Sequence, residues 1–241
     1  MTISKATIKS GEELTLIDYL TPESTQISKH FELESGAKLL YIQVSRTLSV
    51  GSSELTFDLS QGASLEINTV DIDNQQLTRE LQVNLNGEAS TAKIEGLYIS
   101  DRAESVTNNL KVSHFVSNCQ SSQLYKGIVG GTSSFNGHIY IERDAQQSVA
   151  LQENHNILLH DDAKVKTHPW LEIYADDVKC NHGATVGKND DQAIYYMRQR
   201  GISEPQAKWL LMQGFVEQCV AESSEHEQIV EMIQQRLEKL Q

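Results

Sequence analysis

Two side chains that bind soft metals, Cys180 and His182, stand one residue apart within residues 169–187. On an extended strand, residues i and i+2 point to the same face, so the thiol and the imidazole are expected to lie side by side. Such a pair can coordinate iron, zinc or copper, or act as a nucleophile with its base. The pattern is also typical of a buried thiol beside a turn histidine. Two ligands are half of the usual four, so a complete metal site requires ligands from elsewhere.

The other polar residues near this pair are weaker candidates. Asp176 and Asp177 can supply carboxylates for acid–base chemistry, but paired aspartates are also common in turns. His155, His160 and His168 precede them and can converge only if their strands stack. The chain lacks a lysine-bearing phosphate loop, a G-x-S-x-G elbow and an H-E-x-x-H pair. Nothing in these patterns predicts a self-sufficient enzyme.

Composition limits the partners that this chain can have. Its 33 acidic and 20 basic residues give a formal net charge of −13, which disfavours binding to nucleic acid or to anionic membranes. No run approaches the roughly 18 apolar residues of a membrane span, and the first residues lack an apolar signal-peptide core. The three cysteines are widely spaced and odd in number, which is typical of free thiols in a reducing compartment. We therefore expect a cytoplasmic protein.

The elements that must position Cys180 and His182 belong to a long β region. From about residue 13 to residue 174, short runs alternate between apolar and polar residues, and glycine, asparagine, aspartate or serine separates the runs. Alternation with a period of two predicts strands. Clear examples are residues 39–44, 54–59, 82–86, 138–141 and 170–174.

A weak internal repeat indicates how these strands are arranged. The sequence G-A-K-L at residues 36–39 returns as G-A-S-L at residues 62–65, 26 positions later. Residues 86–89 and 161–165 resemble further, more degenerate copies. Repeats of roughly 20–50 residues are typical of solenoids, and a solenoid made only of strands is a β-helix. The alternative is an antiparallel sandwich or jelly roll, in which strands recur roughly every 8–12 residues.

After Gly187 the pattern changes to that of helices. Asp190 and Asp191 can cap a first helix that ends at Gly201, the sequence S-E-P-Q at residues 203–206 opens a second, and Ser224 opens a third. The expected apolar faces of the second and third helices are, respectively, Ala207, Leu210, Leu211, Gly214 and Phe215, and Ile229, Met232, Ile233, Leu237 and Leu240. The chain thus divides into a β-helix core domain of residues 1–187 and a C-terminal helical module of residues 188–241.

The helical module has two possible roles. A solenoid needs a cap over its apolar end, and these helices can provide it. The segment also carries aromatic and arginine side chains, which are enriched in protein interfaces, so it can instead be a docking surface. The residues expected to contact a partner are Tyr196, Arg198, Arg200, Leu210, Leu211 and Phe215.

The stretch L-E-I-Y-A-D-D-V-K-C-N-H-G-A-T-V-G at residues 171–187 resembles the SufB/SufD family of iron–sulfur cluster assembly proteins. Its C-x-H-G-A-T-V-G part is similar to the SufD branch of that family. The resemblance continues through Y-Y-M-R-Q-R-G-I at residues 195–202 and A-K-W-L-L at residues 207–211. Upstream it includes E-N-H at residues 153–155 and K-T-H-P at residues 166–169, so that the specific likeness covers about residues 152–216.

This resemblance implies a mainly β fold, a right-handed parallel β-helix followed by a small C-terminal α-helical module. It also implies that a SufC-type ATPase docks on the C-terminal helices and that a SufB-like subunit, or a second copy in a homodimer, pairs through the β-helix. His182 takes the family's role in cluster assembly at that interface, and Cys180 is its neighbour. No cofactor is then bound permanently, but a transient Fe–S cluster can be shared with the partner chain.

The chain departs from the family pattern in two places. Family members usually carry an N-terminal helical region, whereas this sequence begins almost at once with β-type residues. The resemblance therefore implies a short form that lacks that region. The second departure is His168, which stands where lysine is common before the proline.

The sequence thus predicts a non-enzymatic scaffold subunit of the SUF iron–sulfur cluster assembly complex. Completion of the ligand set by a partner chain explains the spacing of Cys180 and His182 better than a private metal site does. A β-helix carbohydrate-active enzyme is the alternative from another class, and it needs an array of acidic side chains on one face of the solenoid. A third possibility is a purely structural SufC-binding partner with no metal role.

Overall fold

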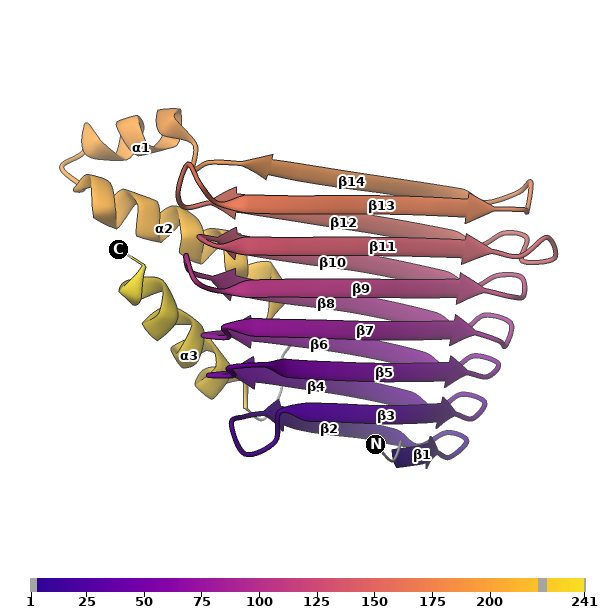
Figure 1. Ribbon diagram of the computed structural model, residues 1–241. Coiled ribbons are helices and arrows are strands. Elements are labelled where there is room, and N and C mark those ends of the chain that lie inside the picture. Colours follow the sequence, from indigo (N-terminus) through magenta and orange to yellow (C-terminus); the bar gives the residue numbers. More distant parts are fainter. Residues whose placement is uncertain (1–3, 221–224, 241) are drawn as a thin grey trace.

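The computed structural model describes residues 4–220 and 225–240, which fold into a parallel β-solenoid with helices at its side (Figure 1). The chain crosses to the opposite sheet after every strand, so odd-numbered strands form sheet A and even-numbered strands form sheet B. Sheet A contains β1 (Ser4–Ile8), β3 (Gln26–Leu33), β5 (Gly51–Leu59), β7 (Gln76–Leu85), β9 (Ser105–His114), β11 (Thr132–Ile141) and β13 (Lys164–Ile173). Sheet B contains β2 (Glu13–Leu20), β4 (Lys38–Arg46), β6 (Ser64–Ile72), β8 (Thr91–Ser100), β10 (Gln120–Val129), β12 (Val149–Leu158) and β14 (Lys179–Gly187).

All pairs of neighbouring strands within the two sheets are parallel. The predicted parallel β-helix is therefore confirmed, and the antiparallel sandwich is wrong. Parallel strands need a crossover between them, and here the crossover of each sheet is a strand of the other sheet. Each turn of the solenoid consequently stacks on the turn before it, which is the arrangement expected of a strand-only repeat.

The register of the sheets shows that one solenoid turn produces the sequence repeat. Lys38 pairs with Ser64, which places the two G-A-x-L sequences one above the other. Gly36 and Gly62 have φ angles of 69° and 63° in the turns from sheet A to sheet B, a conformation that glycine adopts at little steric cost. The copy expected at residues 161–165 is wrong, because it combines the turn from sheet B to sheet A with the start of β13 at Lys164, whereas the earlier copies lie in turns from sheet A to sheet B.

The interior between the two sheets is mainly apolar but holds one buried ionic group. Side chains alternate along each strand between the interior and the outer surface. The apolar interior positions form one large cluster and a smaller one near β13 and β14, and buried polar side chains lie beside them. In one region the guanidinium of Arg79, which is 0% exposed, donates hydrogen bonds to Asp71, Gln43 and Asn108. Since Arg79 and Asn108 lie on sheet A and the other two on sheet B, this group links the sheets.

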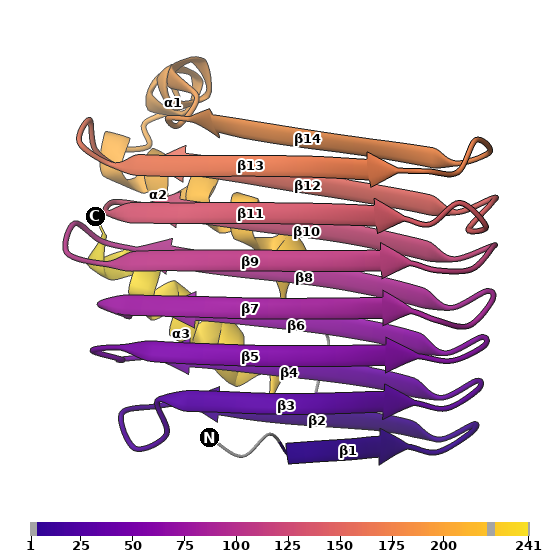
Figure 2. The ribbon, with the colours of Figure 1, turned by 45° about the vertical axis from the view of Figure 1, so that its right-hand side comes forward.

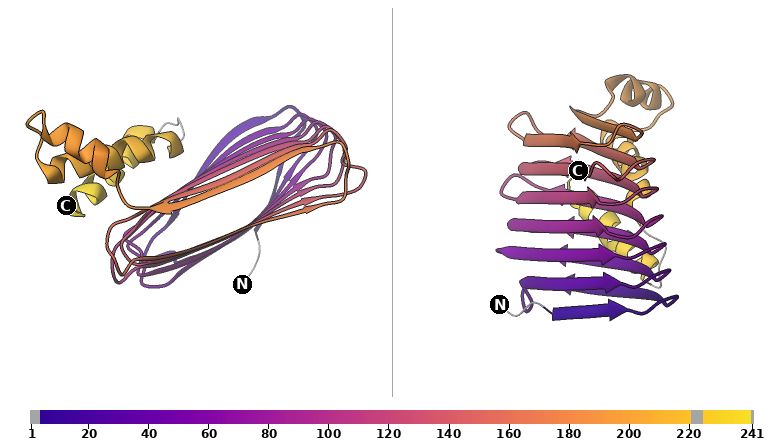
Figure 3. Two further views of the ribbon diagram at one scale, coloured as in Figure 1. Left: turned by 90° about the horizontal axis from the view of Figure 1, so that it is seen from above. Right: turned by 90° about the vertical axis from the view of Figure 1, so that its right-hand side faces the viewer.

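The helices lie beside the solenoid rather than over its end (Figures 1 and 3). They are α1 (Asp191–Arg198), α2 (Glu204–Val216), the 3-10 turn η1 (Glu217–Cys219) and α3 (His226–Lys239). Met212, Val216 and Ile229 belong to an apolar cluster with Ile42 and Ile128 on the outer face of sheet B. The helices therefore cover part of the outer face of sheet B, and the interpretation of the module as an end cap is wrong.

The predicted ends of the first two helices are confirmed. The side chain of Asp190 accepts hydrogen bonds from the first turn of α1, and Ser203 does the same for α2. Gly201, with a φ angle of 88°, lies between the two helices. Ser224 lies outside the described residues, and α3 begins at His226. No helix within residues 4–220 and 225–240 has both the length and the apolar character needed to cross a bilayer.

The buried faces of the helices agree only in part with the sequence pattern. In α3, Ile229, Ile233 and Leu237 are buried as predicted. In α2 the predicted face is confirmed at Ala207 and in part at Phe215, but it is wrong at Leu210 and Gly214, which remain exposed. Apolar residues occur all round α2, so their spacing does not decide which side faces the sheet. The buried residues of α2 are Ala207, Met212 and Val216.

Candidate functional site

The last two strands, β13 and β14, leave one end of the solenoid open. Among the strands of the described ranges, β13 pairs only with β11, and β14 pairs only with β12. Figure 2 shows most of their length free of other elements, with α1 near one end of β14 only. An edge strand presents backbone donors and acceptors that have no ladder partner, and it can therefore pair with a strand from another chain.

Cys180 and His182 lie on β14 and face the same side of it, as predicted. They pair in register with Ala150 and Gln152 of β12, which are buried in the interior. Both side chains therefore belong to the interior side of the open end. Cys180 is half-buried and packs against the apolar cluster that includes Ile139, whereas His182 is exposed. The pair is thus accessible to a ligand or a partner at this end.

Burial raises the pKa of the Cys180 thiol, although a backbone hydrogen bond from Ala150 acts in the opposite direction. At neutral pH the sulfur is therefore protonated. Metals and electrophiles react with the thiolate, so a bound metal or a positive group must displace this proton. Cys119 and Cys219 are 0% exposed, which leaves Cys180 as the accessible sulfur among the three cysteines.

A buried glutamine lies one ladder step from His182. Gln152 is 1% exposed, and its Nε2 donates a hydrogen bond of 2.7 Å to Oε1 of Gln123. Its own Oε1 is buried and accepts no hydrogen bond from the part of the chain that the structure describes. A buried acceptor without a donor is unfavourable. Gln152 therefore leaves one unsatisfied acceptor in the interior, one ladder step from His182.

The other polar residues singled out in the sequence do not join this pair. His155 lies on the outer face of β12, with Nδ1 2.9 Å from a threonine hydroxyl of β14. His168 lies on β13 in the opposite sheet, and His160 lies in the turn after β12. Residues 176–177 occupy the turn between β13 and β14, so their interpretation as turn aspartates is confirmed. Within the described ranges, the Cys180–His182 pair gains no third metal-binding side chain.

Sequence reasoning missed a group of three possible metal ligands elsewhere in the solenoid. His30, Glu32 and Asp58 bring one imidazole nitrogen and two carboxylate oxygens within 4.8 Å of one another. His30 and Glu32 have the same i, i+2 spacing as Cys180 and His182, and this spacing was the available signal. Asp58 joins them through the register between β3 and β5, which a single sequence does not contain.

The two ends of the solenoid differ in character. At the open end, Trp170, Tyr174 and Val186 are 62%, 52% and 44% exposed. At the opposite end, Nζ of Lys29 lies 2.6 Å from a carboxylate oxygen of Asp18. Inward-pointing charges discourage pairing with another strand, whereas large exposed apolar side chains mark interaction sites. The β13–β14 end is therefore the one suited to a partner.

The partner-contacting residues expected in the first helix are accessible. Tyr196 is 57% exposed, and its ring centroid lies 3.5 Å from the guanidinium carbon of Arg200. Arg198 is exposed and forms an ion pair of 3.2 Å with Glu204 at the start of α2. An aromatic ring with a guanidinium stacked on it is a common interface anchor. This cluster remains a predicted docking site.

The corresponding residues of the second helix differ in accessibility. Leu210 is 36% exposed and Leu211 is half-buried. Phe215 packs partly buried against sheet B, where Nζ of Lys126 lies 4.7 Å from its ring centroid and donates to its carbonyl oxygen at 2.8 Å. Phe215 therefore also anchors α2 to the solenoid.

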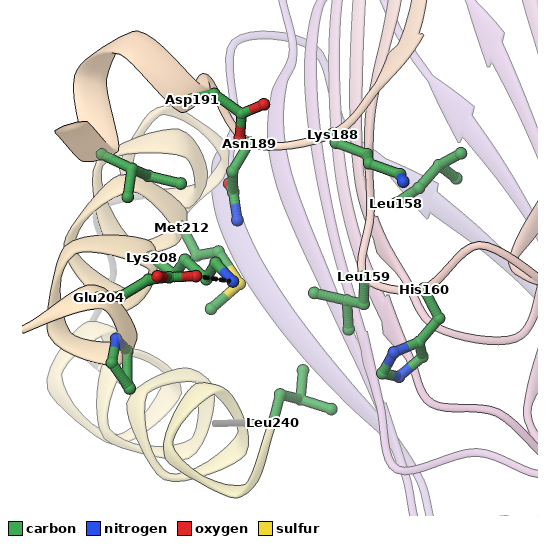
Figure 4. A pocket seen from close by; sticks show the side chains of 12 residues that line it. Leu158, Leu159, His160, Lys188, Asn189, Asp191, Glu204, Lys208, Met212 and Leu240 are labelled. Carbon is green, nitrogen blue, oxygen red and sulfur yellow. Dashed lines mark ion pairs between the residues drawn. The ribbon is translucent and has the colours of Figure 1, made fainter.

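A cleft of about 550 Å³ separates the first half of α2 from the last turns of the solenoid (Figure 4). His160 and Lys188 line it on the solenoid side, and the ion pair of Glu204 and Lys208, 2.8 Å long, lines it on the helix side. Leu240 from the end of α3 contributes an apolar wall. The helices are thus packed closely against sheet B at one end and are separated from the solenoid at the other.

These features define a parallel β-solenoid protein with a thiol and an imidazole side by side on an uncovered edge strand. The chain belongs to the SufBD family. Its residues 7–215 match the family model described as SUF system FeS cluster assembly, SufBD core domain. The resemblance that began at residues 171–187 is therefore confirmed over most of the chain.

Curated relatives support this assignment. The iron-sulfur cluster assembly protein SufD of Escherichia coli (strain K12) is 31% identical over 248 residues, which cover 95% of this chain and 57% of that protein. The SufBD family protein ML0594 of Mycobacterium leprae (strain TN) is 27% identical over 225 residues, which cover 88% of this chain and 57% of that protein. The chloroplastic protein ABCI7 of Arabidopsis thaliana is 39% identical over 98 residues, or 39% of this chain and 21% of that protein. The chain thus spans little more than half the length of the first two relatives.

Proposed function

We propose that this chain is a non-enzymatic scaffold subunit on which an iron–sulfur cluster is assembled. Cys180 and His182 supply part of the ligand set for the nascent cluster, and a second chain supplies the remainder. The cluster is the cargo of the assembly and is held only transiently. The observation that carries this proposal is the position of both side chains on the interior side of β14, at an end of the solenoid that other strands leave uncovered.

The partner that fits this end is a second β-solenoid. Such a chain can align its own terminal strands with β13 and β14 and cover Trp170, Tyr174 and Val186. Ligands on its terminal strand then lie beside Cys180 and His182, which accounts for the incomplete ligand set of this chain. We assign this place to a SufB-like subunit, and a second copy of the chain is the alternative that the experiment below distinguishes.

We also propose that a SufC-type ATPase docks on α1 and on the exposed side of α2. Only residues 188–190 separate β14 from α1, so a force on α1 acts directly on the strand that carries the ligands. The last helix is fixed to the solenoid, because Arg236 of α3 forms ion pairs of 2.7 Å with both Asp73 and Glu104. The cleft of Figure 4 leaves room for α1 and the first half of α2 to move. ATP-driven movement can therefore reposition His182.

Replacement of His182 by alanine is expected to reduce cluster formation about tenfold or more, the usual cost of disturbing a metal-ligand shell. The measurement is the visible absorption of the chain after anaerobic reconstitution with iron, sulfide, a SufB-like subunit and a SufC-type ATPase. The matched control is Asn181→Ala, which changes the neighbouring residue on the opposite face of β14. This control is expected to keep the absorption of the unaltered chain.

Three outcomes separate the alternatives for this site. If His182→Ala assembles as much cluster as the unaltered chain, the ligand role is wrong. If a Cys180→Ala, His182→Ala double variant is fully active whereas removal of residues 203–241 abolishes activity, the chain is a structural partner of the ATPase. If the chain reconstitutes a cluster as a homodimer without the SufB-like subunit, the second copy is the partner.

Simultaneous replacement of Tyr196 by alanine and Arg198 by glutamate is expected to weaken ATPase binding about 30-fold, which corresponds to the ~2 kcal/mol of an interface hot spot. Both side chains lie exposed on α1, so the fold should be retained. Titration calorimetry with the isolated ATPase provides the measurement. Gln235→Ala, on the exposed side of α3, serves as the control. Equal loss in the control, or none in the double variant, removes α1 from the docking surface.

A further inference from the structure

Three metal-binding side chains lie together on the outer face of sheet A, near the end of the solenoid opposite to Cys180 and His182. One ring nitrogen of His30 and one carboxylate oxygen each of Glu32 and Asp58 lie within 4.8 Å of one another. His30 and Glu32 stand at i and i+2 on β3, and Glu32 pairs in register with Asp58 of β5. Two adjacent strands, rather than flexible loops, therefore set their positions (Figure 1).

The Asp58 carboxylate is held so that one of its oxygens faces the histidine. Nδ2 of Asn84 and Nδ2 of Asn86 both donate to Oδ1, at 2.7 Å and 3.2 Å. Oδ2 lies 2.6 Å from Nε2 of His30. Partial burial acts to raise the pKa of Asp58, but the hydrogen bonds from Asn84 and His30 keep that pKa below its usual value. Hydrogen bonds like those from Asn84 and Asn86 orient the side chains that ligate metals. A metal ion must displace the proton that His30 and Asp58 share.

Space for a hydrated ion lies beside the two carboxylates. Glu32 and Asp58 line a cavity of about 360 Å³, together with Thr7 and Asn86, whereas His30 is not part of its lining. Water can therefore reach the two carboxylates. Nζ of Lys5 lies 2.7 Å from Oε1 of Glu32, so a positive charge already sits next to this carboxylate. A metal ion that binds here must compete with Lys5 for Glu32.

We propose that His30, Glu32 and Asp58 bind one divalent transition-metal ion, with water completing its coordination. One imidazole nitrogen with two carboxylate oxygens suits borderline ions such as Zn²⁺ and Fe²⁺. Mg²⁺ and Ca²⁺ instead prefer oxygen ligands throughout. The bound ion ties β3 to β5, and the site is independent of the function proposed for the open end.

Zinc titration of the 241-residue chain tests this site, in a background of Cys180→Ser and His182→Ala that removes the other ligand pair. Calorimetry at pH 7.5 is expected to give one equivalent of bound Zn²⁺. His30→Ala and Asp58→Asn should each weaken binding more than about tenfold. Lys5→Ala should strengthen it about two- to fivefold, because a competing surface ion pair is removed.

The matched control is His138→Ala on the same outer face. His138 faces a single carboxylate, with Nε2 3.1 Å from Oε2 of Glu172, so its loss should leave zinc binding unchanged. Circular dichroism confirms that each variant retains the solenoid. The proposal is overturned if His30→Ala binds zinc as the parent does, if His138→Ala loses as much affinity, or if Mg²⁺ binds as tightly as Zn²⁺.

Discussion

Replacement of Arg79 by alanine is expected to lower the free energy of unfolding by about 3–5 kcal/mol, the cost of leaving a buried charge without its partner. Arg79 and Asp71 are 0% and 1% exposed, with Nη1 of Arg79 2.6 Å from Oδ2 of Asp71. Without the guanidinium, the Asp71 carboxylate stays in the interior with no cation, and Gln43 and Asn108 lose a donor. Urea unfolding followed by circular dichroism measures the change.

A paired replacement separates the charge from the packing. Arg79→Met together with Asp71→Val removes both charges and keeps apolar volume in the interior. Replacing a buried ion pair by apolar residues is often neutral or stabilising, so the double variant should be more stable than Arg79→Met alone. If the double variant is as unstable as the single one, the ion pair is not the reason that Arg79 matters.

Acidification from pH 7.5 to pH 4 is expected to cost the protein about 3 kcal/mol through His114 alone. Burial lowers the pKa of His114 to about 4, against about 6.5 for an unfolded histidine. Between these two pH values the unfolded chain binds a proton that the folded chain does not. The free energy of unfolding therefore decreases as the pH is lowered from about 6.5 to about 4. Below pH 4 both states are protonated and this contribution stops changing.

The replacement His114→Leu isolates this contribution to acid sensitivity. His114 is 0% exposed, its Nδ1 has no hydrogen-bond partner within the described residues, and its Nε2 lies 2.9 Å from the hydroxyl of Ser121. Leucine therefore removes the titrating ring at the cost of this one hydrogen bond. Urea unfolding across the pH range should show a slope for the variant that is flatter than that of the parent. His168→Gln, at an exposed position on β13, should keep the parent slope. An unchanged slope in His114→Leu would contradict the prediction.

The solenoid could be predicted from sequence where its turns are most regular. Residues 38 and 64 pair one above the other, and both follow a glycine and an alanine. Later turns are longer, since Gln120 pairs with Val149. In those turns Ala89 and Asn118 adopt the positive φ angles, 59° and 62°, that glycine adopts earlier. Variable turn length and the replacement of glycine therefore conceal the repeat in the second half of the β region.

Only the part of the candidate site that lies on a single strand could be predicted from the sequence. Two residues at i and i+2 need nothing but the strand period, so the orientation of Cys180 and His182 was within reach. The hydrogen-bond partners of Arg79 come from three other strands. Asp58 and His30 lie on two adjacent strands, β5 and β3. Such contacts depend on register, which local spacing does not specify. The rotation of α2 was also undetermined, because apolar residues surround it.

The last helix, α3, packs against the first turns of the solenoid, and this contact affects folding during translation. Tyr19 of β2 hydrogen-bonds to Glu225 beside α3, and Arg46 of β4 contacts Met232 within it. Each turn pairs only with its neighbours in sequence, so it can form soon after it leaves the ribosome. The apolar strip around Ile42 and Val70 on sheet B, however, is covered by α2 and α3, which are synthesised after β14. A nascent chain therefore exposes this apolar strip through most of its translation. A truncated chain that lacks the helices is expected to aggregate through it.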